Sequence, residues 1–161
     1  MIAAVPLTTG AIGADCLPAV EAISKRAFDP RYGEAWTSAQ CLAALALPGY
    51  RLRGCWRGDD AKTGLVGFAI DRTVVDESEL LLLATDPAAR RTGVARALLD
   101  DWLAMARERH VTRLFLEMRE DNDARALYEQ FGFREIALRL AYYRGGDGLL
   151  RNAVTMDRTI G

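Results

Sequence analysis

The sequence has little that would mark a nucleic-acid binder or a secreted disulfide protein. Its 161 residues carry 21 lysines and arginines against 22 aspartates and glutamates, which gives a formal net charge of -1. Broad binding to a phosphate backbone is disfavoured, because that binding depends on an excess of positive charge. The three cysteines lie far apart and form no CxxC pair, so we expect reduced thiols and no disulfide framework.

Long apolar runs are also missing. No stretch approaches the roughly 18 apolar residues of a membrane-spanning helix, and the apolar residues after Met1 lack the basic segment that begins a signal peptide. We therefore expect a cytoplasmic protein without membrane contact. Nothing suggests a metal site, and His110, the sole histidine, is expected to be a cap or surface residue. The length fits a single domain, which we place at residues 1–161.

Periodicity predicts helices first and then strands. Helical spacing of apolar residues predicts a helix over 15–28, and a capping-box spacing at 37–40 predicts a second helix that ends near 48–49. An antiparallel hairpin follows over 50–75, and the apolar run 79–85 predicts a strand buried on both faces. The remaining pattern predicts a helix from 94 to about 109, a strand over 113–118, a helix over 124–130, and strands over 133–140 and 152–160. This order is typical of an α+β domain with a mixed sheet.

The segment 80–99 joins the buried strand to the next helix through a turn of small residues, and this arrangement suits an anion. A helix start offers unpaired N–H groups, Gly93 lets the backbone approach a ligand, and Arg90 and Arg91 add charge for a diphosphate. The phosphate-loop pattern GxxxxGK[ST] and the dinucleotide pattern GxGxxG are both absent, so those cofactors lose support. A plain strand–turn–helix connection is the alternative.

Two motifs resemble signatures of the GNAT superfamily of N-acetyltransferases. Arg90-x-x-Gly93-x-Ala95 is similar to the pyrophosphate motif [QR]-x-x-G-x-[GA], and the segment 126–133 is similar to the later A-x-x-L-Y-x-x-x-G-F motif. The segments 115–119, 141–143 and 35–37 extend the resemblance toward the bacterial ribosomal-protein-alanine N-acetyltransferases. The resemblance covers residues from about 14 to 156.

This resemblance implies the GNAT fold, a mixed and mostly antiparallel sheet of about six to seven strands flanked by about four helices. It also implies acetyl-coenzyme A as cosubstrate. The cofactor-binding positions that it suggests are Leu83, Ala84, Thr85, Arg90, Arg91, Thr92, Gly93, Val94, Ala95, Arg96 and Asn122. The interval from Glu117 to Tyr128 is one residue shorter than the resemblance leads us to expect, so Asp121 could replace Asn122.

The resemblance assigns the catalytic base to Glu117 and the catalytic acid to Tyr128. A free α-amine has a pKa of about 7.7–8.0, so roughly a tenth is neutral near pH 7. We expect this neutral amine to attack the thioester directly, without a covalent enzyme intermediate. Glutamate is ordinarily a weak base at that pH, so we expect Glu117 to act through a water molecule or through burial. A backbone N–H near Leu83 is expected to polarise the thioester carbonyl. The alternatives are a solvent-facing Glu117 and a Tyr128 that only packs.

The acceptor suggested by the resemblance is a protein N-terminus, specifically the N-terminal alanine of a small-subunit ribosomal protein. We expect Glu34, Trp36, Tyr142 and Tyr143 to line the peptide side, in a monomer or weak dimer without direct nucleic-acid binding. Two other functions stay open. The same fold could acetylate a small amine such as a polyamine, an amino acid or an aminoglycoside, or it could be a non-catalytic acyl-coenzyme A-binding module.

Overall fold

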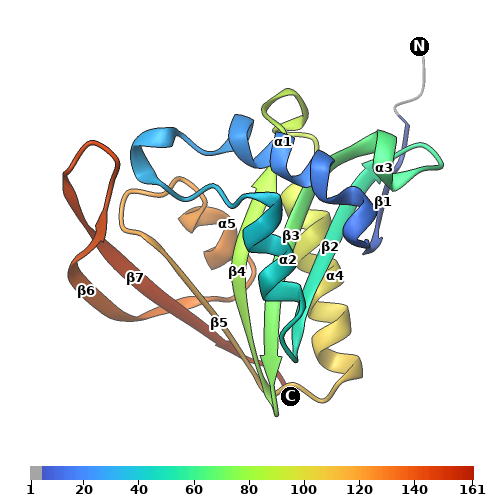
Figure 1. The fold of residues 1–161 in the computed structure, drawn as a ribbon. Coiled ribbons are helices and arrows are strands. Elements are labelled where there is room, and N and C mark those ends of the chain that lie inside the picture. The colour runs from blue at the N-terminus through green and yellow to red at the C-terminus, as the bar shows by residue number, and fades with distance from the viewer. Residues whose placement is uncertain (1–4) are drawn as a thin grey trace.

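The chain forms one seven-stranded sheet in the order β1-β2-β3-β4-β5-β7-β6 (Figure 1). The structure is a computed structural model and describes residues 5–161. Only the β4–β5 pair is parallel among the strand pairs of this range, so the predicted mixed, mostly antiparallel α+β fold is confirmed. The strands are β1 (Leu7–Ala11), β2 (Tyr50–Arg57), β3 (Leu65–Val74), β4 (Glu77–Thr85), β5 (Arg113–Arg119), β6 (Arg134–Arg144) and β7 (Leu150–Thr159).

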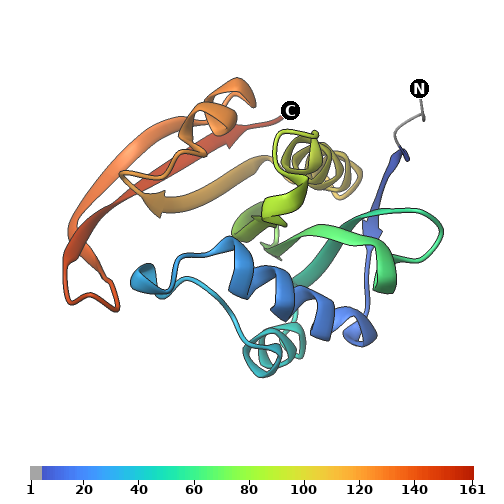
Figure 2. The same cartoon turned by 90° about the horizontal axis from the view of Figure 1, so that it is seen from above.

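Helices cover both faces of the sheet. They are α1 (Leu17–Ala27), α2 (Ser38–Leu45), α3 (Ala61–Gly64), α4 (Val94–Glu108) and α5 (Arg125–Gln130), with single 3-10 turns η1 (Ala14–Cys16), η2 (Pro30–Tyr32) and η3 (Pro87–Ala89). Figure 2 shows α1 and α2 on one face and α4 on the other. Each face has its own apolar core, one centred on Val20, Ile23 and Phe68, the other on Leu98, Trp102 and Met156. Within residues 5–161, no helix is both long and apolar enough to cross a membrane.

The predicted elements agree with the structure except at the N-terminal strand and the β2–β3 connection. The capping box at Thr37 and Gln40 is formed at the start of α2 as predicted. The strand β1 was not predicted, because its residues Leu-Thr-Thr-Gly-Ala are short and mostly small. The polar turn between β2 and β3 contains the one-turn helix α3, which brings the helices of the described chain to five rather than about four.

The prediction that β4 is buried on both faces is wrong. Leu80, Leu82 and Ala84 are buried, whereas Leu81 and Leu83 are only half-buried. The register against β3 shifts at Ile70 and Asp71, which marks a β-bulge in this pair. A bulge re-aims the side chains beyond it. The half-buried positions lie along a cavity that the apolar pattern alone did not reveal.

The parallel pairing of β4 with β5 stops halfway along both strands. The last paired residues are Leu80 and Leu116, and beyond them the two strands diverge (Figure 1). β5 stays paired with β7 as far as Arg119, so it is supported on its other side. The backbone of β4 from Leu81 to Thr85 therefore faces an opening in the middle of the sheet instead of a neighbouring strand. Unpaired strand edges of this kind can donate hydrogen bonds to a bound extended group through their N–H groups and accept them through their carbonyl oxygens.

The helix α4 begins directly against the sheet beside this opening. A Cβ atom at Gly67 on β3 would lie 2.4 Å from Cγ1 of Val94 and 2.9 Å from the carbonyl oxygen of Ala84. Only glycine therefore allows the first residue of α4 to approach β3 so closely. The approach fixes the N-terminus of α4 next to the end of β4.

Candidate active site

A cavity of about 320 Å³ lies where β4 and β5 separate. Its walls come from the α1–α2 loop, β4, β5, the turn before α5, α5 and the end of β6. The lining residues are Phe28, Tyr32, Gly33, Glu34, Trp36, Leu80, Leu81, Leu82, Leu83, Leu116, Glu117, Met118, Asn122, Tyr128, Tyr143 and Arg144. A larger hollow of about 480 Å³ between β1, β2 and α2 has no carboxylate in its lining and includes none of the predicted site residues. The opening in the sheet is therefore the candidate active site.

Glu117 lies on β5 immediately after the last residue that pairs with β4. Its carboxylate accepts a hydrogen bond of 3.2 Å from the Thr155 hydroxyl on β7. The Nε atom of Arg139 on β6 lies 3.5 Å from the same carboxylate oxygen. The side chain is 20% exposed, so the structure places it in the cavity wall rather than on an open solvent face. A carboxylate held in this way can accept a proton from a group bound in the cavity.

Tyr128 reaches the same cavity from α5. It is only 7% exposed, and its ring packs edge-on against Phe133 with centroids 6.2 Å apart. Burial raises the pKa of Tyr128 above the ordinary value for tyrosine. The hydroxyl therefore stays protonated across the physiological range and is a proton donor. The structure brings Glu117 and Tyr128, predicted from separate motifs, to one cavity.

The turn between β5 and α5 decides which of two neighbouring residues faces the cavity. Asn122 lines it, and the Asn122 side-chain oxygen accepts a hydrogen bond of 2.9 Å from the backbone N–H of Ala124. Asp121 is exposed and lies 3.2 Å from Nε of Arg119. Asn122 is therefore the residue of the pair that is placed to contact a ligand in the cavity.

Three of the four residues predicted to line the peptide side lie in the cavity wall. Glu34, Trp36 and Tyr143 line the cavity, whereas Tyr142 does not. Burial raises the pKa of Glu34, and burial with the nearby carboxylates of Glu117 and Glu34 raises the pKa of Tyr143 to about 12. Tyr142 is 51% exposed and packs its ring edge-on against Tyr143. Tyr142 also lies under the guanidinium of Arg139, the partner of Glu117, so it contacts residues of the site without lining the cavity itself.

The turn between β4 and α4, residues 86–93, holds residues predicted to bind a diphosphate and is named the diphosphate turn. Arg91 and Gly93 have left-handed backbone conformations, with φ of 63° and 89°. Gly93 caps α4 without a side-chain hydrogen bond, so the first N–H groups of this 15-residue helix are not satisfied by a capping side chain. Residues 90–93 are exposed. Free N–H groups at a helix start, beside two arginines, fit the diphosphate of a coenzyme.

The predicted arginines of this turn differ in their contacts. Arg90 donates a hydrogen bond of 3.2 Å to the carbonyl oxygen of Ala27 at the end of α1, whereas Arg96 donates one of 2.8 Å to Gln130 on α5. On β4, Leu83 lines the cavity, whereas Ala84 is buried. The other predicted positions are Thr85, half-buried at the end of β4; Thr92, whose hydroxyl donates to Ala89; Val94, buried; and Ala95, half-buried.

Sequence reasoning missed several residues of the site. Arg57 at the end of β2 donates a hydrogen bond of 3.0 Å to the Thr92 hydroxyl and so brings a third arginine to the diphosphate turn. Tyr32 and Arg144 line the acceptor side, and Arg119 packs behind Tyr32. Arg119 lies within the segment 115–119 that carries the resemblance, but no motif gave any of these residues a role, because their relation to the cavity depends on contacts between segments far apart in the sequence.

Comparison with known proteins agrees with this geometry. A family model described as the acetyltransferase (GNAT) domain matches residues 57–145. The match spans β3, β4, α4, β5, α5 and β6, which are the elements that build the opening and the diphosphate turn. The chain belongs to the GNAT acetyltransferase family.

Within this family, the chain is similar to enzymes named for N-terminal and ribosomal-protein acetylation. The chain is 38% identical over 133 residues to the N-alpha-acetyltransferase RimI of Mycobacterium tuberculosis, across 78% of this chain and 77% of that protein. It is 41% identical over 92 residues to the [ribosomal protein bS18]-alanine N-acetyltransferase of Haemophilus influenzae, of which it spans 63% of the length. The crystal structure of the ribosomal-protein-S18-alanine N-acetyltransferase from Escherichia coli superposes with a TM-score of 0.82 at 32% identity, covering 97% of this chain and 95% of that one.

Proposed function

We propose that this protein transfers the acetyl group of acetyl-coenzyme A to the N-terminal α-amine of a protein. The observation that carries the proposal is the placement of Glu117 and Tyr128 in one cavity at the separation of β4 and β5. A base and an acid at the same opening suit a reaction that removes a proton from an amine and returns one to a leaving thiolate. The relatives named for alanine N-acetylation make the N-terminal alanine of a small-subunit ribosomal protein the first acceptor to test.

Acetyl-coenzyme A would supply an activated acyl carbon, with its diphosphate at residues 90–96 and its thioester beside the open edge of β4. A backbone N–H near Leu83 on that edge would donate to the carbonyl oxygen and stabilise its developing negative charge. The amine nitrogen bonds to the carbonyl carbon as the carbon–sulfur bond breaks. Glu117 takes the amine proton, directly or through a water molecule, and Tyr128 gives its proton to the sulfur. Solvent then carries the proton from Glu117 back to Tyr128.

The burial of Tyr128 suits its role as the acid. The pKa of its hydroxyl is raised by burial, and the same dry surroundings penalise the charge of a departing thiolate. A thiolate in such a site binds a proton more strongly than one in water, where its pKa is about 8.5. The two shifts have the same direction, so Tyr128 keeps its ability to protonate the sulfur.

The test is release of coenzyme A from acetyl-coenzyme A in the presence of an acceptor panel. The panel contains peptides that begin with alanine, the same peptides blocked by N-formylation, a polyamine and an aminoglycoside. We expect turnover with the free peptides and none with the blocked ones, because only an unblocked α-amine can attack. Turnover with the small amines alone would assign the protein to small-molecule acetylation. Coenzyme binding without turnover on any acceptor would support an acyl-coenzyme A-binding module instead.

A further inference from the structure

On the acceptor side of the cavity, the Tyr32 ring packs against the guanidinium groups of three arginines, its neighbour Arg31 and two from distant strands. Tyr32, at the end of η2 in the α1–α2 loop, lies with its ring centroid 3.4 Å from the guanidinium carbon of Arg119. The guanidinium carbon of Arg151 on β7 lies 4.6 Å from the same centroid. One ring thus joins the α1–α2 loop to β5 and to the β6–β7 hairpin. Stacking of a planar guanidinium on an aromatic face stabilises such a junction.

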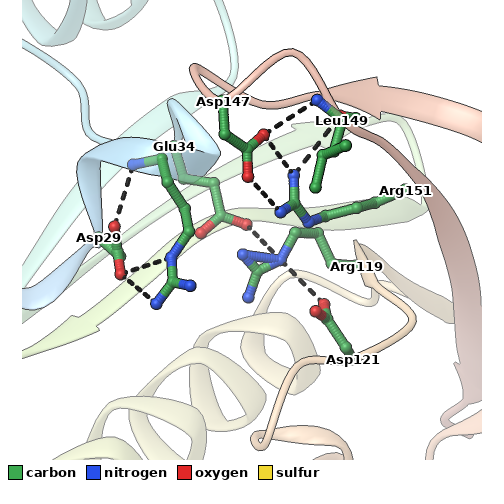
Figure 3. A network of polar contacts seen from close by, with 8 residues as sticks. Asp29, Glu34, Arg119, Asp121, Asp147, Leu149 and Arg151 are labelled. Atoms are coloured by element: carbon green, nitrogen blue, oxygen red, sulfur yellow. Dashed lines mark hydrogen bonds and ion pairs between the residues drawn. The ribbon is translucent and has the colours of Figure 1, made fainter.

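Arg119 is the buried member of this junction. Its side chain is 9% exposed, and Nε lies 3.2 Å from Asp121 and 3.5 Å from Glu34 (Figure 3). Neither Nε nor Nη1 makes a hydrogen bond with the described residues, so stacking on Tyr32 and charge attraction hold the guanidinium. Burying a guanidinium whose Nε and Nη1 make no hydrogen bond is costly even beside two carboxylates, which makes this an unusual arrangement for a group that serves packing alone.

The turn of the β6–β7 hairpin is also bonded directly to the α1–α2 loop. Arg151 forms an ion pair of 2.6 Å with Asp147 in the turn of the β6–β7 hairpin (Figure 3). The backbone N–H of Gly146 in the same turn donates a hydrogen bond of 2.6 Å to the carbonyl oxygen of Arg31. The hairpin and the loop therefore form one continuous wall along the acceptor side of the cavity.

We propose that Arg119 is a positioning residue for the acceptor and acts through Tyr32 and Glu34, both of which line the cavity. The proposal rests on the function proposed above. Arg119 stands two positions after Glu117 on β5, so the same strand that carries the base also fixes the wall beside it. The wall sets where an incoming amine stands relative to Glu117, and the contacts of Arg119 and Tyr32 do not include residues of the diphosphate turn. Loss of the junction should therefore weaken acceptor binding and leave coenzyme binding unchanged.

The experiment measures kcat and KM for the acceptor and for acetyl-coenzyme A in three variants of the junction and in one control variant. Arg119→Lys keeps the charge but loses the planar group, and Tyr32→Leu removes the ring. We expect both to raise the acceptor KM about tenfold or more, with kcat and the coenzyme KM changed less than about twofold. Tyr32→Phe keeps the ring and should restore the native acceptor KM. Arg125→Lys, an exchange at an ion-paired arginine on α5 outside this junction, is the matched control.

Hydrogen exchange of residues 29–37 in the substrate-free protein gives a second readout that needs no turnover. Arg119→Lys should lose protection there, whereas Arg125→Lys should not. An unchanged acceptor KM in Arg119→Lys, an equal rise in both KM values, or unchanged loop protection would overturn the proposal. If the native protein acetylates no peptide, the proposed function fails, and the exchange result alone then decides whether Arg119 holds this wall.

Discussion

Glu117 and Tyr128 are held in the cavity in different ways. The carboxylate of Glu117 is anchored from β7 by Thr155 and from β6 by Arg139, so its direction is fixed before any ligand binds. Tyr128 is fixed by packing against Phe133, and its hydroxyl makes no hydrogen bond to another residue in the range 5–161. A base held by its neighbours and an acid whose O–H is free to donate suit the two proton transfers of amine acylation.

The raised pKa of Tyr128 leads to a prediction about pH. The neutral fraction of an α-amine grows up to about pH 8, so kcat/KM should rise through that range. A tyrosine whose pKa is raised by burial keeps its proton past the ordinary value of about 10, so the rate should show no alkaline fall below that value. The measurement is a pH profile of kcat/KM for the native protein and for Tyr128→Phe. An alkaline fall well below about pH 10 that disappears in Tyr128→Phe would contradict the assignment.

At the scale of elements, α1 holds the start of α2. The Glu21 carboxylate on α1 accepts a hydrogen bond of 2.9 Å from the backbone N–H of Ser38, and it also bonds the Ser38 hydroxyl. Lys25 lies 2.8 Å away on the same helix. Hydrogen bonds from Lys25 and Ser38 lower the pKa of Glu21 to about 2. The contact fixes the angle at which the chain leaves the α1–α2 loop.

We predict that Glu21→Gln lowers the thermal stability near neutral pH and that the difference from the native protein shrinks in acid. A carboxyl whose folded pKa is depressed stabilises the fold fully above its unfolded value, and that stabilisation is lost as pH falls toward the folded value. The window here runs from about pH 4.5 down to about pH 2. Melting curves across this range test it, with Glu108→Gln at the exposed end of α4 as control. A difference that stays constant through the window would show that Glu21 acts without its charge.

Whether a segment forms a helix or a strand was easier to predict than how the helices and strands pair and pack. Helical periodicity predicted α4 from its apolar face, which includes Leu98 and Trp102, and the pattern Thr37-x-x-Gln40 predicted the start of α2. These signals are local and survive in any tertiary setting. The end of β4–β5 pairing at Leu80 is set by strand register, which no single segment encodes. The contact between Arg119 and Tyr32, on which their proposed roles rest, joins segments far apart in the sequence and is likewise not encoded in either one.

The candidate site was predicted most fully where a motif carried it. Glu117 and Tyr128 came from segments that carry the resemblance, and both line the cavity. The loop between them departs from the family pattern and left Asn122 and Asp121 as alternatives, of which Asn122 lines the cavity. Tyr142 was expected beside Tyr143, but adjacent strand residues face opposite ways unless a bulge intervenes. The backbone of Ala141 has a positive φ of 52°, and the pairing of β6 with β7 is interrupted there. Sequence alone did not show which tyrosine would turn inward.

At the scale of the whole molecule, the sheet forms two halves that share α4 on one face. The diphosphate turn depends on how closely α4 approaches β3, and that approach depends on the absence of a side chain at Gly67. The proposed acyl chemistry depends instead on the separation of β4 and β5. The proposed coenzyme binding and the proposed acceptor chemistry therefore depend on different parts of the fold.

We therefore predict that Gly67→Ala weakens coenzyme binding more than a matched glycine change. The new Cβ would push the start of α4 away from β3, and overpacking of this kind costs about 1–3 kcal/mol of stability. Gly10→Ala on β1 is the control, because its Cβ would lie 3.4 Å from Trp56, in ordinary contact. Calorimetric titration with coenzyme A and urea unfolding test both effects. Equal coenzyme affinity in the two variants would show that Gly67 does not affect the diphosphate turn.

Acetylation of a free alanine peptide by Glu117→Gln and Tyr128→Phe, followed by mass spectrometry, tests whether this cavity holds the base and the acid. Glu129→Gln on the exposed face of α5 and Tyr50→Phe beside the other hollow serve as controls. We expect the two site variants to lose about 10²–10⁴-fold in kcat while they bind coenzyme A as tightly as the native protein. Native turnover in both site variants would contradict the assignment of acid and base to this cavity.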